Sequence, residues 1–365
     1  MKQDLSPRAF LVRLFVCTLA VLIVTGSVLV LLDPFSHYRA PSSDYVINDR
    51  FCMNGMVRHN EYGAALVGSS MCQNFDMDLL DSLSGSEVLK AVKGGMTIDE
   101  SEQVCRWLSS AGKADTVFLG LDLTRFNEGR VEEYYPTYLS NDTVLDDWRY
   151  LYGYEAWMRY LPLDALILSL EAIGAPLPSA IRTETDPDAI GRWAERAEAA
   201  GDFVGEEKLV ENYLSGKGTV ARQNTEGMAD RMKARLDRFL ENDPFDPDTT
   251  YYVFFSPYSS LFWAHYERQG ATEELFAFRV YFFERLSEYK NVIPLDFQAM
   301  EETENLNLYK DISHYHQSVN DRMAEGFFSG EFITDGSRAS ENNEKIRAAV
   351  ERLFERYPAL QAPLN

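Results

Sequence analysis

Five short apolar runs constrain the fold of this chain more than any other feature of its sequence. Each run is too short for a helix, is rich in Val, Phe, Tyr or Leu, and shows continuous rather than alternating apolarity. This pattern is typical of strands that are buried on both faces of a parallel sheet. The runs are Ala64–Val67, Val88–Val92, Thr116–Leu121, Tyr251–Phe255 and Asn291–Pro294.

Stretches of helical character lie between these runs, for example Ile98–Ser109 and Thr272–Tyr289. Alternating strands and helices imply right-handed crossover connections. We therefore predict an α/β fold, an open parallel five-stranded sheet with helices on both faces (a three-layer sandwich). Ligands of such sheets bind beyond the carboxyl ends of the strands.

One interval breaks the alternation. From about Arg125 to Asp248 no convincing strand is apparent. The first part of the interval is dense in Tyr and Trp, and the remainder, about Asp186 to Glu241, is charged and helix-forming. We interpret it as a large helical insertion, either a lid or a substrate platform. Its aromatic side chains could stack on sugar rings, although aromatic side chains more often pack a core.

The N-terminus carries the strongest compositional signal. Leu14–Leu32 contains no charged residue, and at a rise of about 1.5 Å per residue it can cross a hydrocarbon core of about 30 Å. Lys2, Arg8 and Arg13 precede this run, and Asp33 ends it. The positive-inside rule then predicts a cytoplasmic N-terminus and an extracytoplasmic remainder.

Two alternatives compete with a retained anchor. A cleaved signal peptide usually has a shorter apolar core and a small-residue cleavage site, and no good site follows the run. A buried core helix is rarely apolar all round over such a length. We therefore expect a single-pass protein of the cell membrane. Its predicted parts are a cytoplasmic tail (1–13), an anchor (14–32), a juxtamembrane connector (33–59), an α/β domain (60–335) and a C-terminal helix and tail (336–365).

Charge and cysteine content exclude other classes of protein. The formal net charge is −22 over 365 residues, and no run of Lys or Arg offsets it, so we expect no nucleic-acid partner. Cys17 lies in the predicted anchor, which leaves Cys52, Cys72 and Cys105 outside it. At most one internal disulfide can form among these three, so the domain is not held together by disulfides.

The first candidate for chemistry is Ser70, in the sequence Gly68-Ser69-Ser70-Met71 directly after the first predicted strand. Glycine permits a tight turn there, which places the serine at the carboxyl edge of the sheet. We expect the segment from Cys72 to Ser82 to be helical, with its N-terminal N–H groups and positive dipole directed at Ser70. The alternative is that the serine is only a helix N-cap.

The second candidate is the pair Asp311 and His314, which follows the last predicted strand and precedes a helix-forming stretch from Gln317. Asp and His three residues apart can meet in a turn. The carboxylate then accepts a hydrogen bond from imidazole Nδ1 and leaves Nε2 free as a general base. His316 has Ser313 rather than a carboxylate three residues before it. The alternative is an exposed turn pair without a catalytic role.

A serine after the first strand and Asp-x-x-His at the far end of an α/β chain together resemble the SGNH (GDSL-like) hydrolase superfamily. The resemblance implies that Ser70 is the nucleophile of a catalytic triad with His314 and Asp311. It also implies an oxyanion hole formed by the N–H of Ser70 and that of a glycine after the second strand, where Gly94 and Gly95 stand. We expect neither a metal nor another cofactor, because zinc, dinucleotide and P-loop signatures are missing from the sequence.

The third block of this superfamily is Gly-x-Asn, and the chain departs from it. Asp122 follows the strand Thr116–Leu121, where the superfamily has an asparagine that donates to the oxyanion. An ionised carboxylate only accepts hydrogen bonds and repels an oxyanion. Asp122 is therefore either protonated, or it has another role and leaves the oxyanion hole to backbone groups. Asn127 could substitute only if its loop folds back.

A narrower resemblance is to membrane-anchored SGNH-like proteins of bacterial envelope-polymer systems, such as the alginate O-acetyltransferases and the protein that completes teichoic-acid D-alanylation. It rests on the anchor, Gly-Ser-Ser, the strand end Phe254 to Ser259 and Asp-x-Ser-His-Tyr, and it covers about Asn60–Asn127 and Thr249–Phe328. Those proteins work beside a membrane-bound O-acyltransferase. The resemblance implies such a partner, together with an envelope polysaccharide or another glycan as acceptor.

The function that follows is acyl transfer through an acyl-Ser70 intermediate. A sugar hydroxyl resolves this intermediate in an O-acyltransferase, and water resolves it in a carbohydrate esterase (deacetylase). We expect Tyr258, Trp263 and Ser69 to contact the substrate. The alternative from another class is a non-catalytic envelope protein with a degenerate site, which binds a glycan or a membrane partner and which Asp122 favours.

Overall fold

The structure is a computed structural model that describes residues 6–33, 53–128, 191–217 and 224–363. These residues belong to two units, one comprising 1–60 and 135–186 and the other 61–134 and 187–365. The predictions for most of the juxtamembrane connector, for Cys52 and for the aromatic first part of the insertion lie outside the described residues.

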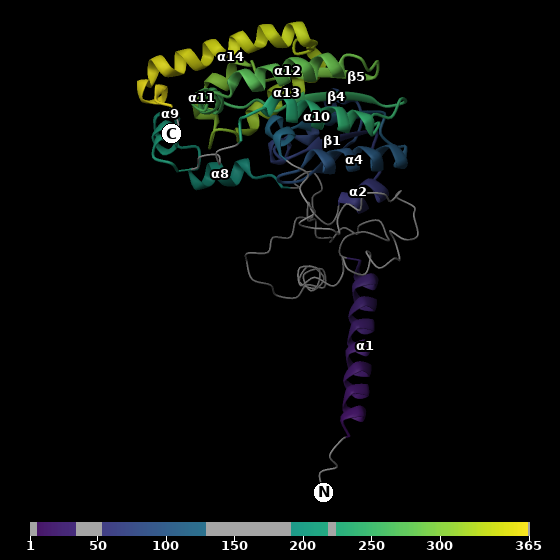
Figure 1. The fold of residues 1–365 in the computed structure, drawn as a ribbon. Coiled ribbons are helices and arrows are strands. Elements are labelled where there is room, and N and C mark those ends of the chain that lie inside the picture. Colours follow the sequence, from purple (N-terminus) through teal and green to yellow (C-terminus); the bar gives the residue numbers. More distant parts are fainter. Residues whose placement is uncertain (1–5, 34–52, 129–190, 218–223, 364–365) are drawn as a thin grey trace. The chain divides into compact units, whose positions relative to one another are not determined.

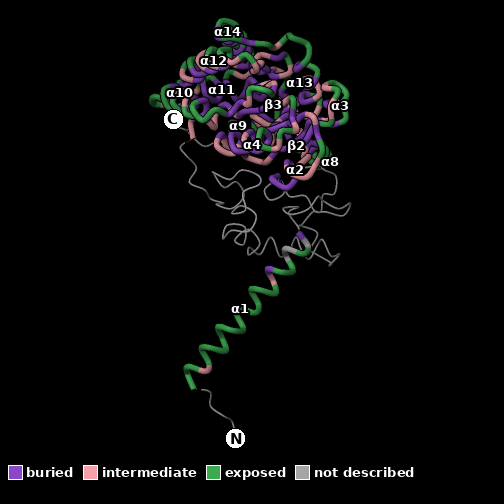
Figure 2. The backbone as a smooth tube through the Cα atoms, turned by 90° about the vertical axis from the view of Figure 1, so that its right-hand side faces the viewer, coloured by how far each residue is buried: buried purple, intermediate pink, exposed green. Residues whose placement is uncertain are grey.

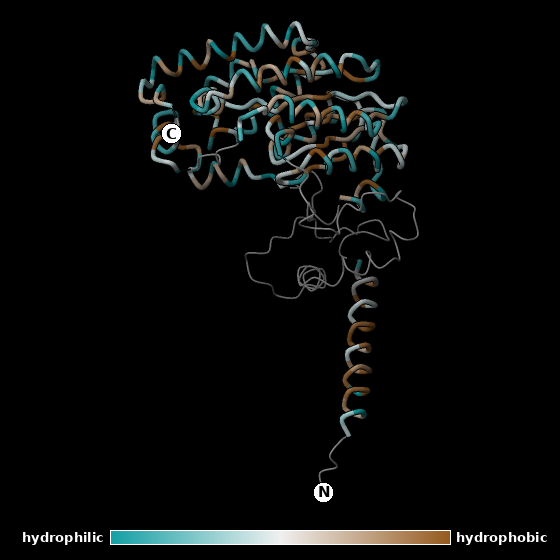
Figure 3. The backbone as a smooth tube through the Cα atoms, in the orientation of Figure 1, coloured by the Kyte–Doolittle hydropathy of each residue, from teal (hydrophilic) through white to brown (hydrophobic). Residues whose placement is uncertain are grey.

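The N-terminal helix α1 (Pro7–Leu32) begins earlier than the uncharged run. The Ser6 hydroxyl caps it by accepting a hydrogen bond from the N–H of Ala9 at 3.3 Å, and proline suits the first helical position. Most residues of the helix are exposed (Figure 2), large apolar residues among them, and most of its length is hydrophobic (Figure 3). By length and composition, Pro7–Val28 can cross a membrane. The prediction of an N-terminal helix long and apolar enough to span a membrane is confirmed. The side of the membrane on which each end lies stays a prediction. A short helix, α2 (Met53–His59), belongs to the same unit.

The second unit is built on a five-stranded sheet, and all five predicted strands are confirmed. They pair in parallel in the order β2-β1-β3-β4-β5. Nearly every strand residue is buried, which explains why the runs are continuously apolar. The strands are β1 (Ala64–Gly68), β2 (Val88–Val92), β3 (Thr116–Leu121), β4 (Thr250–Phe255) and β5 (Val292–Asp296).

Helices accompany the sheet in the alternation that the sequence predicts (Figure 1). The α-helices are α3 (Met77–Ser84), α4 (Ile98–Ala111), α8 (Ala194–Ala200), α9 (Glu206–Leu214), α10 (Met228–Glu241), α11 (Ser260–Arg268), α12 (Thr272–Leu286), α13 (Gln317–Ser329) and α14 (Gly336–Arg356). The short 3₁₀ helices are η1 (Ser70–Cys72), η2 (Leu123–Asn127), η4 (Glu301–Glu304), η5 (Leu306–Leu308) and η6 (Pro358–Gln361).

Two neighbouring phenylalanines of β4 show that both faces of the sheet are covered. Successive strand residues point to opposite faces. The ring of Phe254 packs against Phe327 of α13 with 5.1 Å between centroids, and the ring of Phe255 packs against Phe282 of α12 at 4.1 Å. On the first face α13 contacts α3, and on the second α12 contacts α10.

Two helices pack on the helices that cover the sheet, although the sequence assigned one to the insertion and the other to a C-terminal extension. α10 falls within the predicted insertion, yet it packs on α12 and α4 as the crossover helix between β3 and β4. α14, predicted as a C-terminal extension, packs on α11 and α12. The other described part of the insertion contains α8 and α9 and is helical, as predicted.

A buried hydrogen bond attaches α9 to α11. The Tyr213 hydroxyl lies 3.0 Å from Nδ1 of His265, and Gln269 bonds to the other ring nitrogen. Burial is the main reason why the pKa of His265 falls to about 4, and the nearby charge of Arg268 lowers it further. The imidazole is therefore neutral in the folded protein at neutral pH.

We expect folding stability to fall as the pH drops from 6.5 to about 4, because the unfolded chain binds a proton at His265 in this range and the folded chain does not. At about 1.4 kcal/mol per pKa unit, the loss has a ceiling of roughly 3 kcal/mol. Urea unfolding of the detergent-solubilised full-length protein at several pH values measures it. His265→Gln should flatten this part of the pH dependence, and an unchanged slope in that variant would contradict the prediction.

Candidate active site

Ser70 and Asp122 lie where the strand order of the sheet changes direction. The chain leaves β1 for β2 on one side of it and then returns to β3 on the other side. Ser70 follows β1 and Asp122 follows β3, so both stand at the carboxyl ends of adjacent strands. A crevice that binds ligands typically forms at such a switch point.

The turn at Ser70 depends on close packing of Cys72 beneath the end of β1. A Cβ at Gly68 would lie 2.4 Å from the Cys72 sulfur, and a Cβ at Gly120 would lie 2.6 Å from it, so both positions require glycine. The Cys72 thiol is fully buried, and this burial raises its pKa well above the ordinary value. Cys72 is therefore unsuited to act as a nucleophile, whereas Ser70 is partly exposed.

The predicted start of the helix from Cys72 to Ser82 is wrong. Ser70 starts a single 3₁₀ turn, and α3 begins only at Met77. Asp76 caps α3, because its carboxylate accepts a hydrogen bond from the N–H of Leu79 at 3.2 Å. α3 thus does not begin directly after Ser70, and the expected contribution of its N-terminal N–H groups to an oxyanion there is not supported.

The structure brings Ser70, His314 and Asp311 together. Ser70 Oγ lies 3.0 Å from His314 Nε2, and His314 Nδ1 lies 2.9 Å from Asp311 Oδ2. The side chains of His314 and Asp311 are each 33% exposed, so solvent reaches the pair. In this geometry a carboxylate can orient an imidazole, and the imidazole can take a proton from a serine.

Asp311 is held in place by its own loop. Its Oδ1 accepts hydrogen bonds from the backbone N–H groups of Ser313 and His314, both at 2.8 Å. Burial opposes ionisation of this carboxyl, but the hydrogen bonds and the charge of His314 outweigh it and lower the pKa of Asp311 below the ordinary value. The carboxylate is therefore ionised and can stabilise a positive imidazole.

Two buried hydrogen bonds connect the Ser70 turn to the segment that carries His314. The carbonyl oxygen of Met71 accepts one from the Tyr315 hydroxyl and one from Asn320 Nδ2, both at 3.0 Å. Because Met71 follows Ser70 and Tyr315 follows His314, these bonds set the distance between serine and histidine.

The segment after β4 supports the same loop from another side. Ser259 Oγ donates to the carbonyl oxygen of Ile312 at 2.7 Å, and the Tyr309 hydroxyl donates to that of Pro257 at 2.8 Å. Pro257, Ser259 and Ile312 lie in the strand end and the loop that the sequence singled out as short motifs, and Tyr309 precedes that loop. The loop is therefore fixed on both flanks of Asp311.

The turn after β2 carries the two glycines that were expected beside the oxyanion. The N–H of Lys93 donates to the carbonyl of Gly68 at 3.0 Å, which joins this turn to β1. The N–H of Met96 closes the turn on the Lys93 carbonyl at 3.1 Å, with Gly94 and Gly95 in between. Gly95 has a φ of +68°, as the third residue of a type II turn requires.

The backbone N–H groups of Ser70 and Gly95 make no hydrogen bond within the part of the chain that the structure describes. They belong to two turns that follow adjacent strands and are joined through Gly68. An oxyanion hole requires such unoccupied donors beside the nucleophile.

The pKa of Asp122 is raised above the ordinary value of an aspartic acid. Burial is the main cause that raises its pKa. A hydrogen bond from the Ser69 side chain and the charges of Arg125 and His314 counteract this effect only in part. A raised pKa favours the neutral acid, which can donate a hydrogen bond. The first of the two roles considered for Asp122 is therefore the better supported.

Arg125 lies against the glycine turn. Glu128 holds its Nη1 through both carboxylate oxygens at 2.8 Å, and a Cβ at Gly95 would lie 3.4 Å from its Nη2. The guanidinium thus places a positive charge beside the candidate oxyanion hole. Asn127 is engaged elsewhere, since its Oδ1 accepts from Arg231 Nη2 at 3.0 Å, and it does not take the place of the missing asparagine.

The three residues expected to contact a substrate are buried. Ser69 is 2% exposed, Tyr258 3% and Trp263 1%. Ser69 caps the 3₁₀ turn, Tyr258 stacks on Phe262 with 4.1 Å between centroids, and Trp263 donates to Gln298 Oε1 at 3.2 Å. The structure therefore places these side chains beneath the site, where they support it, and their contact with a substrate stays a prediction.

Trp193 completes the site although the sequence did not single it out. Its Nε1 donates to the carbonyl oxygen of Ser70 at 3.0 Å, and its ring meets that of His314 edge-on with 5.3 Å between centroids. Asn74 Oδ1 accepts from the N–H groups of Trp193 and Ala194, both at 3.0 Å. No local signal could have revealed this residue, because its position depends on where the insertion returns to the sheet.

A cavity of about 190 Å³ adjoins the candidate triad. Asp311 and its neighbours Lys310 and Ile312 line one side, and Leu209 and Tyr213 of α9 line the other. The cavity thus lies between the loop that carries Asp311 and α9.

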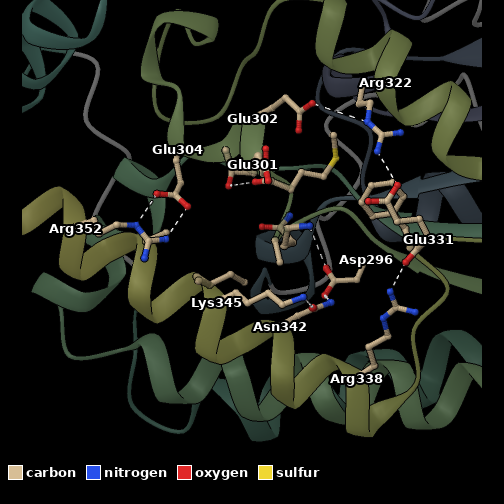
Figure 4. Close-up of a pocket in the computed structure, with 17 residues that line it drawn as sticks. Asp296, Glu301, Glu302, Glu304, Arg322, Glu331, Arg338, Asn342, Lys345 and Arg352 are labelled. Atoms are coloured by element: carbon tan, nitrogen blue, oxygen red, sulfur yellow. Dashed lines mark hydrogen bonds and ion pairs between the residues drawn. The ribbon is translucent and has the colours of Figure 1, made fainter.

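A larger cavity, of about 570 Å³, lies beyond β5 between η4, α13 and α14 (Figure 4). Charged side chains line it, and several are paired with each other: Arg352 with Glu304 at 2.7 Å and Arg322 with Glu331 at 2.7 Å. None of the candidate triad or oxyanion residues lines this cavity.

Comparison with known proteins returned no relative: no protein-family model, curated protein or solved structure matches the chain. Among the described residues, no three His, Cys, Asp or Glu side chains are grouped so that they could hold a metal ion.

We expect Gly68→Ala to destabilise the fold by about 2 kcal/mol, because its Cβ collides with the Cys72 sulfur. The same change in a Cys72→Ala background should cost clearly less. Urea unfolding of the four proteins in this double-mutant cycle measures the coupling. Additive effects would show that the two side chains do not compete for this space.

Proposed function

We propose that the protein is a serine-dependent acyl-transfer enzyme of the SGNH-hydrolase type. It moves an acyl group through Ser70 to a hydroxyl of a cell-envelope or extracellular polysaccharide. One observation carries the proposal: a continuous hydrogen-bond chain from Asp311 through His314 to Ser70, at the carboxyl edge of a parallel sheet. A nucleophile, a base and an orienting carboxylate in this order favour acyl transfer over other reaction classes.

In the first step, His314 Nε2 takes the proton of Ser70 while Oγ attacks the carbonyl carbon of an ester or thioester donor. The unoccupied N–H groups of Ser70 and Gly95 stabilise the oxyanion, and protonated Asp122 can supply a further donor. The bond to the leaving group then breaks, and the leaving group takes the proton from His314. Asp311 stays ionised and stabilises the imidazolium throughout.

In the second step, a sugar hydroxyl gives its proton to His314 and attacks the acyl-serine. Collapse of the intermediate forms the new ester, and Ser70 recovers its proton from His314. Water in place of the sugar turns the same site into a carbohydrate esterase. The transferase therefore needs the acceptor to displace water before the second attack.

The motif order and the sheet support assignment to the SGNH type. A serine after β1, a glycine turn after β2 and Asp-x-x-His after β5 occur on a five-stranded parallel sheet. The apolar helix α1 supports attachment to the cell membrane. An enzyme domain outside the cytoplasm is inferred from the positive-inside rule, because Lys2, Arg8 and Arg13 precede the uncharged run. A membrane-bound O-acyltransferase is the partner that would deliver the acyl group. Fold likeness alone does not fix a reaction, so the proposal rests on the site.

A non-catalytic glycan-binding protein is the second candidate, and Asp122 is the observation that favours it. An ionised Asp122 beside Ser70 would oppose an oxyanion and leave the site degenerate. The two functions therefore differ in whether Ser70 is activated.

Labelling with a fluorophosphonate tests the proposal directly. We expect a stoichiometric adduct on Ser70 of the full-length protein in detergent, found by intact mass and peptide mapping, because a serine beside a base attacks this phosphorus electrophile. Ser70→Ala and His314→Ala should both abolish it. A folded wild-type protein without an adduct would favour the binding-protein function.

Asp122→Asn tests the protonated carboxyl. We expect the variant to label at least as fast as the wild type at neutral pH, because the amide is a permanent donor. As the pH rises, wild-type labelling should decline where Asp122 loses its proton, while the variant should lack this decline. Labelling rates measured at several pH values between about 6 and 10 give the pH profile of each protein. Identical profiles would exclude Asp122 as the donor.

A further inference from the structure

The segment 191–194 is attached to the Ser70 turn and to α13 at several points. Trp193 and Ala194 bond to Asn74, and Arg192 Nη2 donates to Gln317 Oε1 at 3.0 Å. Gly191 has a φ of +67° and passes so close to Gln73 that a Cβ there would lie 2.3 Å from its side chain. This end of the insertion is therefore part of the site and not a distant appendage.

Trp193 is the one side chain in this segment that touches two members of the candidate triad. Its indole N–H binds the carbonyl oxygen of Ser70, which orients the peptide group that follows the serine. Its ring stands at 87° to the imidazole of His314, which restricts rotation of that ring. The two contacts therefore constrain the distance between Ser70 Oγ and His314 Nε2, in addition to Asp311's bond with Nδ1.

The indole is itself fixed. Asn74 holds its backbone, and the ammonium group of Lys310 lies 5.0 Å from the centre of its ring. Lys310 belongs to the His314 loop, because its N–H donates to the His314 carbonyl at 3.0 Å. Trp193 therefore bridges the Ser70 turn and the His314 loop, through contacts separate from those at the Met71 carbonyl.

We propose that Trp193 is a positioning residue that holds Ser70 and His314 in the geometry for proton transfer, and that Asn74 anchors it there. The inference deepens the proposed function and rests on it. Trp193 acts through the serine peptide and the imidazole, without itself exchanging a proton. Loss of its N–H should therefore affect the position of Ser70, and loss of its ring should affect the position of His314.

The experiment compares Trp193→Phe, which keeps a ring without the N–H, with Trp193→Ala, which loses both. We expect the rate of fluorophosphonate labelling of Ser70 to fall about tenfold in Trp193→Ala and less in Trp193→Phe, because small displacements of reacting groups cost rate steeply. Asn74→Ala should lie between them. Trp107→Phe is the matched control, since Trp107 is a buried tryptophan on α4. It should change the melting temperature without changing the labelling rate.

A second measurement does not require activity. The ¹⁵N chemical shifts of the His314 ring in the full-length protein report which ring nitrogen carries the proton, and we expect them to change in Trp193→Ala. The inference would be overturned if Trp193→Ala were labelled at the wild-type rate. It would also be overturned if the labelling rate fell no further in Trp193→Ala than in Trp107→Phe. If the wild type is not labelled, the proposed function fails. Unchanged His314 shifts would then overturn the positioning role, whereas changed shifts would support it.

Discussion

The candidate site depends on one acceptor, the carbonyl oxygen of Met71. Tyr315 and Asn320, which are 244 and 249 residues further along the chain, both donate to it inside the protein. An unsatisfied buried carbonyl costs about 1–3 kcal/mol, so separation of the two segments is penalised directly. Because Ser70 precedes Met71 and His314 precedes Tyr315, the requirement to satisfy one backbone group also brings serine and histidine into hydrogen-bonding distance.

The two carboxyl groups near His314 have pKa values that are shifted in opposite directions, and for different reasons. Asp311 is kept ionised by hydrogen bonds from its own loop, whereas burial raises the pKa of Asp122. The pKa values of two carboxyl groups near one imidazole are thus shifted in opposite directions. Such a division lets one carboxylate stabilise a positive histidine and leaves the other neutral beside a developing negative charge. Arg125 adds a positive charge on that same side of the site.

The sequence predicted what depends on local pattern. The strands were apparent because burial on both faces requires continuous apolarity, and Asp311 meets His314 because three residues of a turn bring them together. It failed where the outcome depends on distant packing. Trp263 was expected to contact a substrate but is buried in the core, α10 was assigned to the insertion but is a crossover helix, and Trp193 reaches Ser70 only through the tertiary fold. The start of α3 was missed because Asp76 is a cap that competes with Ser69.

A buried ion pair beyond β5 gives the site its second support. Arg279 and Asp296 are fully buried, and Asp296 Oδ1 accepts from the N–H of Gln298 at 3.1 Å. Gln298 in turn bonds through its side chain to the Ser256 carbonyl, in the segment whose Ser259 holds the Asp311 loop. An apolar replacement of such a pair is often equally stable, so stability alone does not account for it. Apolar side chains would not orient Gln298, and the strand end that positions Ser259 would lose that contact. The charge pair is therefore better explained by the position it imposes on the loop than by the energy it contributes.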